Sequence, residues 1–512
     1  MDNRDRKKNI IRKIIRDIRQ FSRRLCKNKA LRPYQVEPLL CILDSIDNKK
    51  AKIITVMMSR QSGKNESSGQ LEGFLLIRNK KRGGTIVKAA PTWKPQIVNS
   101  MLRLQDVLDN PLTRKLHRGR FGFMRFLGKA CIAFFSAEPN AKVVGATADL
   151  LLEIDEAQDV NQQKYDKDFA PMGANKAVTT VFWGTAWDTD NMLEKQRQLN
   201  MAKDKVRARE LGCRVEDLPP EERYHFEYDA NEVARYNPDY EAYFRREVER
   251  LGIDHPIIQT QYLLKAIAAA GKFFNPQQLA KLQGEHERYH KPESGRRYVA
   301  AIDIAGKDEE AQDAVLRGLK PQKDSTVLFV GELDFSVCDE INTDPRINIV
   351  EITYRTGHDF DQQKLELLSD LQLWKPDYVI SDARGIGADI SSWLAKKYSA
   401  VEEHQATDKT NSEDGFDILA RVNTGLLKMF TDDGSEGYRE FWNQARLCRY
   451  EIRAQQKLSF FVKETEGHDD FMKGLGYLVR SAKGFAVPVG ESTTVDYETL
   501  LEEDDDFYDD FR

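Results

Sequence analysis

The feature that most constrains the fold is an apolar strand followed by a Gly-Lys loop and a helix. Residues 53–58 read Ile-Ile-Thr-Val-Met-Met and predict a buried strand, and residues 66–79 are compatible with a helix. A strand, a glycine-containing loop and a helix in this order place backbone amides and the positive end of a helix dipole beside an anion. The loop therefore predicts a phosphate-binding site made by Arg60, Gln61, Ser62, Gly63, Lys64 and Asn65.

Two residues depart from the general phosphate-loop pattern Gly-x-x-x-x-Gly-Lys-Ser/Thr. Met58 stands at the first glycine, and Asn65 replaces the hydroxyl residue that holds Mg²⁺. Gly63-Lys64 alone would be typical of a turn with an exposed lysine. The flanking strand and helix instead favour an ATP site, in which Lys64 reaches the β- and γ-phosphates and the amide oxygen of Asn65 can bind the metal.

A second apolar run, residues 150–154, leads into Asp155-Glu156. A buried strand that ends in adjacent acids supplies an aspartate that positions a metal ion and a glutamate that polarises the attacking water. The same pair of acids is often only a helix cap. Together with Lys64, however, it predicts ATP hydrolysis, with Asp155 as a metal ligand and Glu156 as a catalytic residue.

Two further segments complete the predicted ATP site. Thr185 follows the apolar strand that ends in Phe-Trp-Gly, where it can sense the γ-phosphate and couple hydrolysis to motion. Upstream of the loop, Tyr34 can stack on adenine and Gln35 can hydrogen-bond the edge of the base.

Composition describes a soluble globular protein with an uneven charge distribution. The net charge is −4, yet residues 1–32 hold thirteen Lys or Arg against three acids, and residues 502–510 hold seven acids and no base. Apolar residues recur at helical spacing from Ile10 to Phe21, which predicts a basic amphipathic helix suited to a DNA backbone or an acidic partner. The six cysteines are scattered, as in a reducing compartment. No apolar run is long enough to cross a bilayer, so no membrane association is expected.

Alternation of short apolar runs with helical segments predicts an α/β protein with a parallel-type sheet and crossover helices. The expected organisation has six parts: a basic amphipathic helical extension (1–30), a P-loop ATPase core (31–190), a helical lid or linker subdomain (191–270), a linker (271–295), a second catalytic domain (296–490) and an acidic tail (491–512).

These elements, in this order, resemble the large subunits of tailed-bacteriophage terminases, the motors that pump DNA into capsids. The matches are residues 59–64 (Ser-Arg-Gln-Ser-Gly-Lys), residues 155–159 (Asp-Glu-Ala-Gln-Asp) and Gly184-Thr185, and the resemblance covers residues 31 to 490. It implies an ATPase and a metal-dependent endonuclease of RNase H-like fold that package viral DNA. The implied cofactors are ATP and Mg²⁺, with Mn²⁺ able to substitute in the nuclease. The implied partners are double-stranded DNA, a small terminase subunit and the portal of the procapsid, with the motor forming a homo-oligomeric ring in the host cell cytoplasm.

The chain departs from the family at one catalytic position. Many members carry an arginine just before a glycine, upstream of the Asp-Glu strand, which stabilises charge during phosphoryl transfer. Here Val143 and Val144 precede Gly145. Lys142, Arg60 and Arg125 are left as alternative substitutes.

The RNase H-like domain should bring carboxylates together, and acids occur at suitable places. Asp303 lies among apolar residues in a predicted strand, where burying a lone carboxylate is costly unless a metal or partner is present. Asp382 ends the strand 378–381, and Asp469 and Asp470 open a helical segment. Carboxylates from two strand ends and a helix start can hold two Mg²⁺ or Mn²⁺ ions for phosphodiester cleavage. The predicted metal ligands are therefore Asp303, Asp382 and either Asp470 or Asp469. Asp470 is favoured and joins Asp303 and Asp382 as the catalytic set, while Asp469 either caps the helix or shares the metal.

Two residues near these acids have open roles. Asp324 begins the next predicted strand and is either a fourth, outer acid or a hairpin residue. His468 either orients the scissile phosphate or caps the helix.

Two other functions remain as alternatives. A helicase or repair translocase with a resolvase-like nuclease would need helicase motifs in a second lobe, and none follows Thr185. A non-hydrolysing assembly scaffold would account for Met58 and Asn65, and measuring phosphate release would separate it from a motor.

Overall fold

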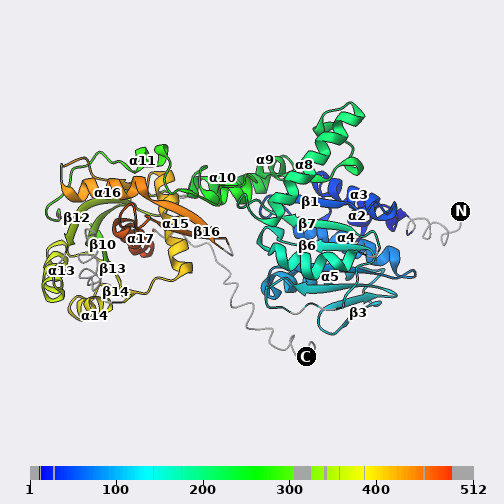
Figure 1. The fold of residues 1–512 in the computed structure, drawn as a ribbon, viewed down its shortest axis with the longest axis horizontal. Coiled ribbons are helices and arrows are strands. Elements are labelled where there is room, and N and C mark those ends of the chain that lie inside the picture. Colours follow the sequence, from blue (N-terminus) through cyan, green and yellow to red (C-terminus); the bar gives the residue numbers. More distant parts are fainter. Residues whose placement is uncertain are drawn as a thin grey trace. The chain divides into compact units, whose positions relative to one another are not determined.

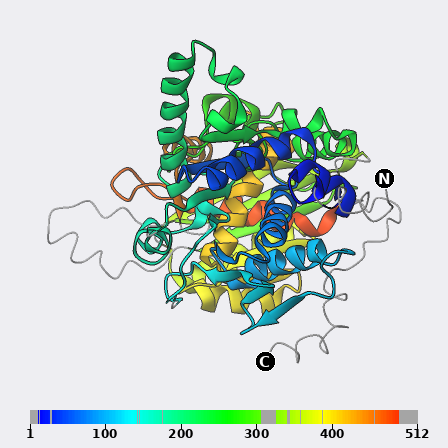
Figure 2. The same ribbon diagram turned by 90° about the vertical axis from the view of Figure 1, so that its right-hand side faces the viewer.

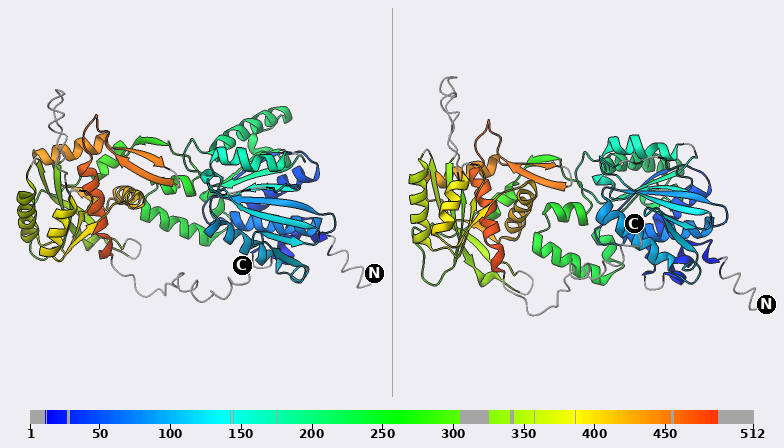
Figure 3. Two further views of the ribbon diagram at one scale, coloured as in Figure 1. Left: turned by 60° about the horizontal axis from the view of Figure 1, so that its bottom comes forward. Right: turned by 90° about the horizontal axis from the view of Figure 1, so that it is seen from below.

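The computed structural model describes residues 11–486 except 12, 27–28, 142, 144, 175, 305–324, 340–342, 357, 386 and 454–455. Within them the chain forms two compact units: the first comprises 11–244 and 259–267, and the second comprises 245–258 and 268–486. Each unit has its own central sheet (Figures 1 and 3). Lys142, Asp324, the first ten residues of the basic extension and the acidic tail lie outside the described residues.

The first unit is built on an eight-stranded sheet with the order β3-β4-β5-β2-β6-β7-β1-β8. From β5 to β8 all neighbouring strands pair in parallel, which confirms the predicted parallel-type sheet. At the other edge, β3 and β4 form an antiparallel hairpin that joins β5. The strands are β1 (Ile53–Met58), β2 (Gly84–Ala90), β3 (His117–Arg120), β4 (Met124–Leu127), β5 (Ala130–Ser136), β6 (Leu151–Ile154), β7 (Thr179–Gly184) and β8 (His225–Tyr228).

Helix α4 (Lys64–Asn79) follows the Gly-Lys loop, as predicted, and packs against α5 (Val98–Leu108). Glycine at position 73 permits their close approach, because a Cβ there would lie 2.5 Å from Cγ1 of Val107. The continuous apolar runs of β1 and β2 are buried as expected for strands covered on both faces. The loop after β1 and the end of β6 therefore lie on the same side of the sheet, at the carboxyl ends of its parallel strands.

The described part of the basic extension forms the amphipathic helix α2 (Ile18–Leu25), which precedes α3 (Pro33–Asp47). Ile14, Ile18 and Phe21 are buried, and the Phe21 ring meets that of Phe74 on α4 at 5.5 Å in an edge-to-face contact. The apolar side of this helix is thus part of the core of the first unit.

The segment 191–270 contains more than the predicted helices. It holds α8 (Met192–Leu211), α9 (Ala230–Ala234) and α10 (Pro238–Leu251), and α8 projects from the sheet (Figure 2). It also supplies β8, which pairs in parallel with β1 and widens the sheet. Because β8 is only four residues long and contains Glu227, the segment carries no clear strand pattern.

The second unit has a six-stranded sheet with the order β14-β13-β10-β11-β12-β15. β10, β11 and β12 are successively antiparallel, while β13 and β14 add in parallel on the other side of β10. This is the RNase H-like arrangement, so the predicted fold class is confirmed. The strands are β10 (Tyr298–Asp303), β11 (Ser325–Asp334), β12 (Arg346–Thr356), β13 (Tyr378–Asp382), β14 (Val401–His404) and β15 (Leu427–Met429).

Alternate residues of β10 pack into two different hydrophobic cores, one on each face of the sheet. Tyr298, Ala300 and Ile302 pack with α13 (Phe360–Trp374) and α14 (Gly387–Lys397). Val299 and Ala301 pack on the opposite face with α15 (Asp408–Thr424), α16 (Glu436–Leu447) and α17 (Asp470–Ser481). Period-two alternation therefore turns Asp303 toward the α17 face.

The segment 271–295, predicted as a linker, belongs to the core of the second unit. Phe273, Phe274 and Leu282 are buried there, and Leu282 lies on α11 (Pro276–Leu282). The adjoining strand β9 (Ala270–Lys272) pairs with β16 (Arg449–Arg453), which pairs with β17 (Lys457–Phe461). The linker prediction was wrong because polar and turn-forming residues dominate the segment and conceal its few core positions.

Candidate active sites

The loop between β1 and α4 has the shape of an anion cradle. Gly63 has φ 93°, in the left-handed region, and a Cβ there would lie 2.4 Å from Nε2 of Gln35. Gln61 is also left-handed, with φ 62°. Lys64 then begins α4, so the loop wraps the helix N-terminus, where the dipole and the first amides favour a phosphate.

Tyr34 and Gln35 brace this loop from behind. The Tyr34 hydroxyl donates to the Ser62 carbonyl at 2.6 Å, and the Gln35 amide donates to the Gly63 carbonyl at 3.0 Å. Both side chains are almost fully buried. The structure thus gives them contacts with the loop backbone, and their contact with adenine stays a prediction.

The ammonium of Lys64 meets both acids that follow β6. It lies 2.5 Å from Oε1 of Glu156 and 3.4 Å from Oδ1 of Asp155. Burial alone would lower the pKa of Lys64, but the two carboxylates raise it above its ordinary value. Burial likewise opposes ionisation of Asp155, yet the ammonium groups of Lys64 and Lys88 hold its pKa below the ordinary value. The site therefore keeps a charged lysine and a charged aspartate.

Glu156 is linked to the end of the neighbouring strand β7 by Gln158, a residue with no predicted role. Gln158 donates to Oε2 of Glu156 at 2.7 Å and accepts from the Thr185 amide at 3.3 Å. The Thr185 hydroxyl in turn donates to Gln261 at 3.2 Å. Glu156 itself has φ 45°, a strained left-handed backbone for a side-chain-bearing residue. A movement of the Glu156 side chain would therefore be transmitted through Gln158 to the backbone amide of Thr185.

A second buried lysine, Lys88 on β2, lies beneath this site. It forms an ion pair with Glu72 on α4 at 2.8 Å, and both side chains are essentially inaccessible to solvent. The neighbouring Glu153 accepts from Ser68 and from the Trp183 indole, and burial raises its pKa to about 8. The only sequence signal was one charge in an otherwise apolar strand.

Three cations were alternatives for the missing family arginine, and one of them, Arg125, lies far from the ATP site of this chain. Arg125 is a buried residue of β4, five strands from β1 in the sheet, which is about 24 Å at the usual spacing. Arg60 lies in the phosphate loop and is exposed. Lys142 is outside the described residues.

The donor set at this edge suits a Mg²⁺-nucleotide. The loop amides and Lys64 suit phosphates, while Asp155 and the exposed amide of Asn65 offer the hard oxygen ligands that Mg²⁺ requires. Met58, which stands where the phosphate-loop pattern has its first glycine, is the last residue of β1. Its side chain is fully buried and does not obstruct the loop.

In the second unit, three elements carry the predicted nuclease acids to one end of the sheet. Asp303 and Asp382 end the parallel neighbours β10 and β13, in which Ile302 is registered with Ser381. Asp470 is the first residue of α17, which packs on β10. Its Oδ2 accepts from the Ser325 amide at 2.9 Å, at the start of β11. The topology therefore brings these acids to the same end of β10.

Asp303 is the carboxylate most affected by its acidic neighbours. Burial raises the pKa of Asp303 well above its ordinary value, and Asp470, Asp382 and Asp469 raise it further, while Lys473 opposes them. Burial also raises the pKa of Asp382, against the effect of Arg384, whose Nε lies 3.5 Å from Oδ1. Such a buried cluster of oxygen donors suits Mg²⁺ or Mn²⁺, which would neutralise it.

The acids are not yet arranged around a common point. Within the described ranges, no three His, Cys, Asp or Glu side chains are placed so that they could hold a metal ion together. Side-chain rotation would be needed to complete an ion site. Metal binding by Asp303, Asp382, Asp469 and Asp470 stays a prediction.

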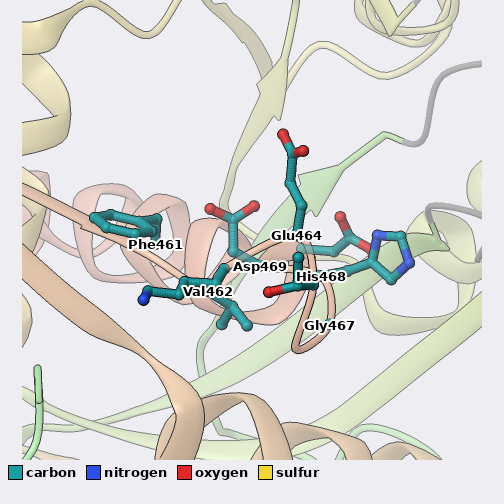
Figure 4. A pocket seen from close by; sticks show the side chains of 9 residues that line it. Phe461, Val462, Glu464, Gly467, His468 and Asp469 are labelled. Atoms are coloured by element: carbon teal, nitrogen blue, oxygen red, sulfur yellow. The ribbon is translucent and has the colours of Figure 1, made fainter.

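A polar pocket of about 670 Å³ opens on two of these acids, Asp469 and Asp470. It is lined by residues 461–465 and 467–470, and Figure 4 shows the side chains of Glu464, His468 and Asp469 around it. On the next turn of α17, the Lys473 ammonium lies 3.9 Å from Oδ2 of Asp469. Glu464, Lys473 and Arg384 had no predicted role, although Lys473 is four residues after Asp469 and Arg384 is two residues after Asp382, a spacing that could have identified them.

No protein-family model matches the chain, and no curated protein matches it. Among solved structures, the chain is similar to the large terminase from a thermophilic bacteriophage, with a TM-score of 0.49 and 12% identity over 88% of this chain and 98% of that chain. It is also similar to the HK97 bacteriophage large terminase, with a TM-score of 0.35 and 13% identity over 88% and 94% of the two chains. The large terminase nuclease from the thermophilic phage G20c, solved with bound magnesium, matches 41% of this chain and 96% of its own length, with a TM-score of 0.31 and 16% identity.

Proposed function

We propose that the chain is the large terminase subunit of a tailed bacteriophage, an ATP-driven motor that packages double-stranded DNA and cuts it with a metal-dependent endonuclease. The observation that carries the proposal is the contact of Lys64 with Asp155 and Glu156 in the same chain as an RNase H-like sheet with acids at its strand ends. Neither unit alone distinguishes a packaging motor from a simple ATPase or nuclease.

In the ATP site, Lys64 and the loop amides bind the phosphates, and Asp155 and Asn65 hold Mg²⁺. The ion, when bound, neutralises charge that develops on the phosphates. Glu156 orients and deprotonates the attacking water once its carboxylate leaves Lys64. Gln158 transmits the position of Glu156 to Thr185 through the hydrogen bonds described above.

In the nuclease site, Asp303, Asp382 and Asp470 hold two divalent cations, with Asp469 beside them. Bound ions of this kind activate water and stabilise the leaving 3′ oxygen. Lys473 and Arg384 contribute positive charge at the same place, which favours approach of a phosphodiester.

Support for DNA as the partner comes from the β3–β4 hairpin. Residues 110–137 contain six Lys or Arg and no acid. Arg118 and Arg120 lie on β3, the edge strand, and both are exposed, as is Phe121 at the tip with 76% of its surface accessible. A basic edge with an aromatic tip suits contact with the phosphate backbone.

Other partners follow from the proposed function: the portal of the procapsid, a small terminase subunit, and further copies of this chain in a ring, in the host cell cytoplasm. No helix among the described residues has both the length and the apolar character that spanning a bilayer demands.

The proposal is tested with purified chain by measuring phosphate release from ATP with and without duplex DNA, and nicking of plasmid DNA with Mn²⁺. Lys64→Ala should abolish phosphate release and leave nicking intact, while Asp303→Ala should do the reverse. Absence of phosphate release from the unsubstituted chain would favour the scaffold alternative. ATP-dependent strand separation of a forked duplex would favour the helicase alternative.

A further inference from the structure

Lys88 lies at a place where a charge is costly. Its side chain is 1% exposed in the middle of β2, cross-strand from Glu153 on β6. Its ammonium donates to Ser68 Oγ and to Glu72 Oε1, both at 2.8 Å, and both partners lie on α4. Replacing a buried ion pair by apolar residues of similar volume is often neutral or stabilising, so packing alone does not account for it.

The same ammonium reaches the ATP site through Asp155. Oδ2 of Asp155 is 3.9 Å from the Lys88 ammonium, and Oδ1 is 3.4 Å from the Lys64 ammonium. Asp155 is 4% exposed, so neither charge contact is screened by bulk water. The carboxylate thus has one oxygen toward the phosphate loop and the other toward β2.

These two lysines differ in what they can do when a nucleotide binds. Lys64 begins α4 beside the loop and is available to phosphates. Lys88 is held by Ser68 and Glu72 within the sheet–helix interface and has no route to the nucleotide. When phosphates draw Lys64 away, Lys88 is the cation that stays beside Asp155.

We propose that Lys88 is a positioning residue of the ATP site: it holds Oδ2 of Asp155 so that Oδ1 faces the loop and can bind Mg²⁺. The inference deepens the proposed ATPase function, because it depends on Asp155 being the metal ligand. Groups that orient a metal ligand commonly change metal affinity or activity by about 10- to 100-fold when they are removed. Lys88 would therefore act on the Mg²⁺ requirement more than on nucleotide binding itself.

The test uses the full chain and the double variant Lys88→Met/Glu72→Gln, which removes both charges of the buried pair with little change in volume. Binding of mant-ATP is measured in EDTA and across a Mg²⁺ titration, together with phosphate release and the thermal unfolding temperature. We expect the half-saturating Mg²⁺ concentration to rise about 10- to 100-fold. Affinity for mant-ATP in EDTA and the unfolding temperature should stay close to those of the parent.

Lys52→Met is the matched control. Lys52 is also a buried lysine of the first unit, but its ammonium donates to the carbonyls of Glu221 and Arg223, away from the ATP site. This variant should keep the parental Mg²⁺ requirement in its folded fraction. A rise equal to that of the double variant would show that loss of any buried lysine has the same effect, and would overturn the proposal.

Four other outcomes bear on the proposal. A parental Mg²⁺ requirement in the double variant means that Lys88 only neutralises Glu72, and loss of mant-ATP binding in EDTA means that the loop itself is distorted; both overturn the proposal. If the double variant does not fold, Glu72→Gln alone must keep the parental Mg²⁺ requirement, because its Lys88 remains beside Asp155. If the unsubstituted chain binds Mg²⁺–mant-ATP without hydrolysing it, the ATPase function fails while the binding data still test Lys88.

Discussion

The ammonium of Lys64 lies 2.5 Å from Oε1 of Glu156, so the lysine expected to bind phosphates is held by the acid expected to activate water. The same carboxylate accepts from Gln158 through its other oxygen. Phosphates entering the loop must compete with Glu156 for Lys64. In the proposed function, nucleotide binding would therefore release the Glu156 carboxylate from Lys64 in a single exchange.

Glu156→Gln should separate binding from hydrolysis. Without the carboxylate, Lys64 loses its competing partner, and ATP affinity should rise by up to about 5-fold, equal to ~1 kcal/mol for a partly exposed pair. Phosphate release should fall at least about 100-fold because the water is no longer activated. Fluorescent-nucleotide titration and a phosphate-release assay measure the two effects, with Glu138→Gln, an exposed glutamate of the same unit, as control. Weaker ATP binding in Glu156→Gln would contradict the exchange.

The local sequence pattern was sufficient to predict the strands that carry the two sites. Residues 53–58 were recognised because strands buried on both faces have continuous apolar runs, and β1 has those bounds. Asp303 stood out because alternation could not explain a charge in that strand. Where a residue's role is set by its own strand, loop or helix, the sequence sufficed.

Roles that depend on pairing between distant segments could not be predicted. Lys88 is a single charge in an otherwise apolar strand, but its role could not be predicted because its partners, Glu72 and Asp155, come from α4 and from the end of β6. Gln158 gains its role only because β7 is the neighbour of β6. In the same way, β8 is a strand only because the edge of β1 is available to it.

Asp470 and Asp469 should differ in the nuclease site. Asp470 has the strongest charge effect on Asp303, whereas Asp469 lies beside Lys473. Asp470→Asn should reduce Mn²⁺-dependent nicking at least about 100-fold and abolish the rise in thermal unfolding temperature that Mn²⁺ gives the parent. Asp469→Asn should keep that rise and lose less activity. Asp334→Asn, at the end of β11 and paired with Arg346, is the control. The reverse ranking of Asp469 and Asp470 would assign the metal to Asp469.

The β3–β4 hairpin should contribute to DNA binding through its charge. Arg118 and Arg120 are exposed, and neither forms an ion pair with any carboxylate in the described part of the chain. Arg118→Glu/Arg120→Glu should weaken duplex binding and reduce the slope of log K against log salt by about 2, one for each phosphate that is no longer neutralised. Lys205→Glu/Arg209→Glu, an equal charge change on exposed residues of α8, should leave that slope unchanged. Phosphate release without DNA should be unaffected in both variants, which excludes damage to the ATP site.

Asp414 should make the second unit less stable as pH rises. This carboxylate is buried on α15 and accepts from Arg480 Nε at 2.9 Å, and burial raises its pKa to about 6 even though Arg480 opposes the shift. Because the folded pKa lies above the unfolded value of about 3.9, the folded protein binds this proton more tightly than the unfolded chain does. Its stabilising contribution is therefore complete below about pH 4 and is lost as pH rises through about 6.

The variant Asp414→Asn removes that titration. Relative to the parent, its free energy of unfolding should rise by about 3 kcal/mol between about pH 4 and pH 7, from roughly two pKa units at 1.36 kcal/mol each. Urea denaturation of the full chain in EDTA, followed by tryptophan fluorescence across this range, measures the difference. The comparison uses the change with pH, because the different packing and neutral hydrogen bonding of Asn and Asp at residue 414 change stability by an amount that does not depend on pH. A difference that stays flat across this range would mean that Arg480 keeps Asp414 ionised in the folded protein, and that the ion pair outweighs burial.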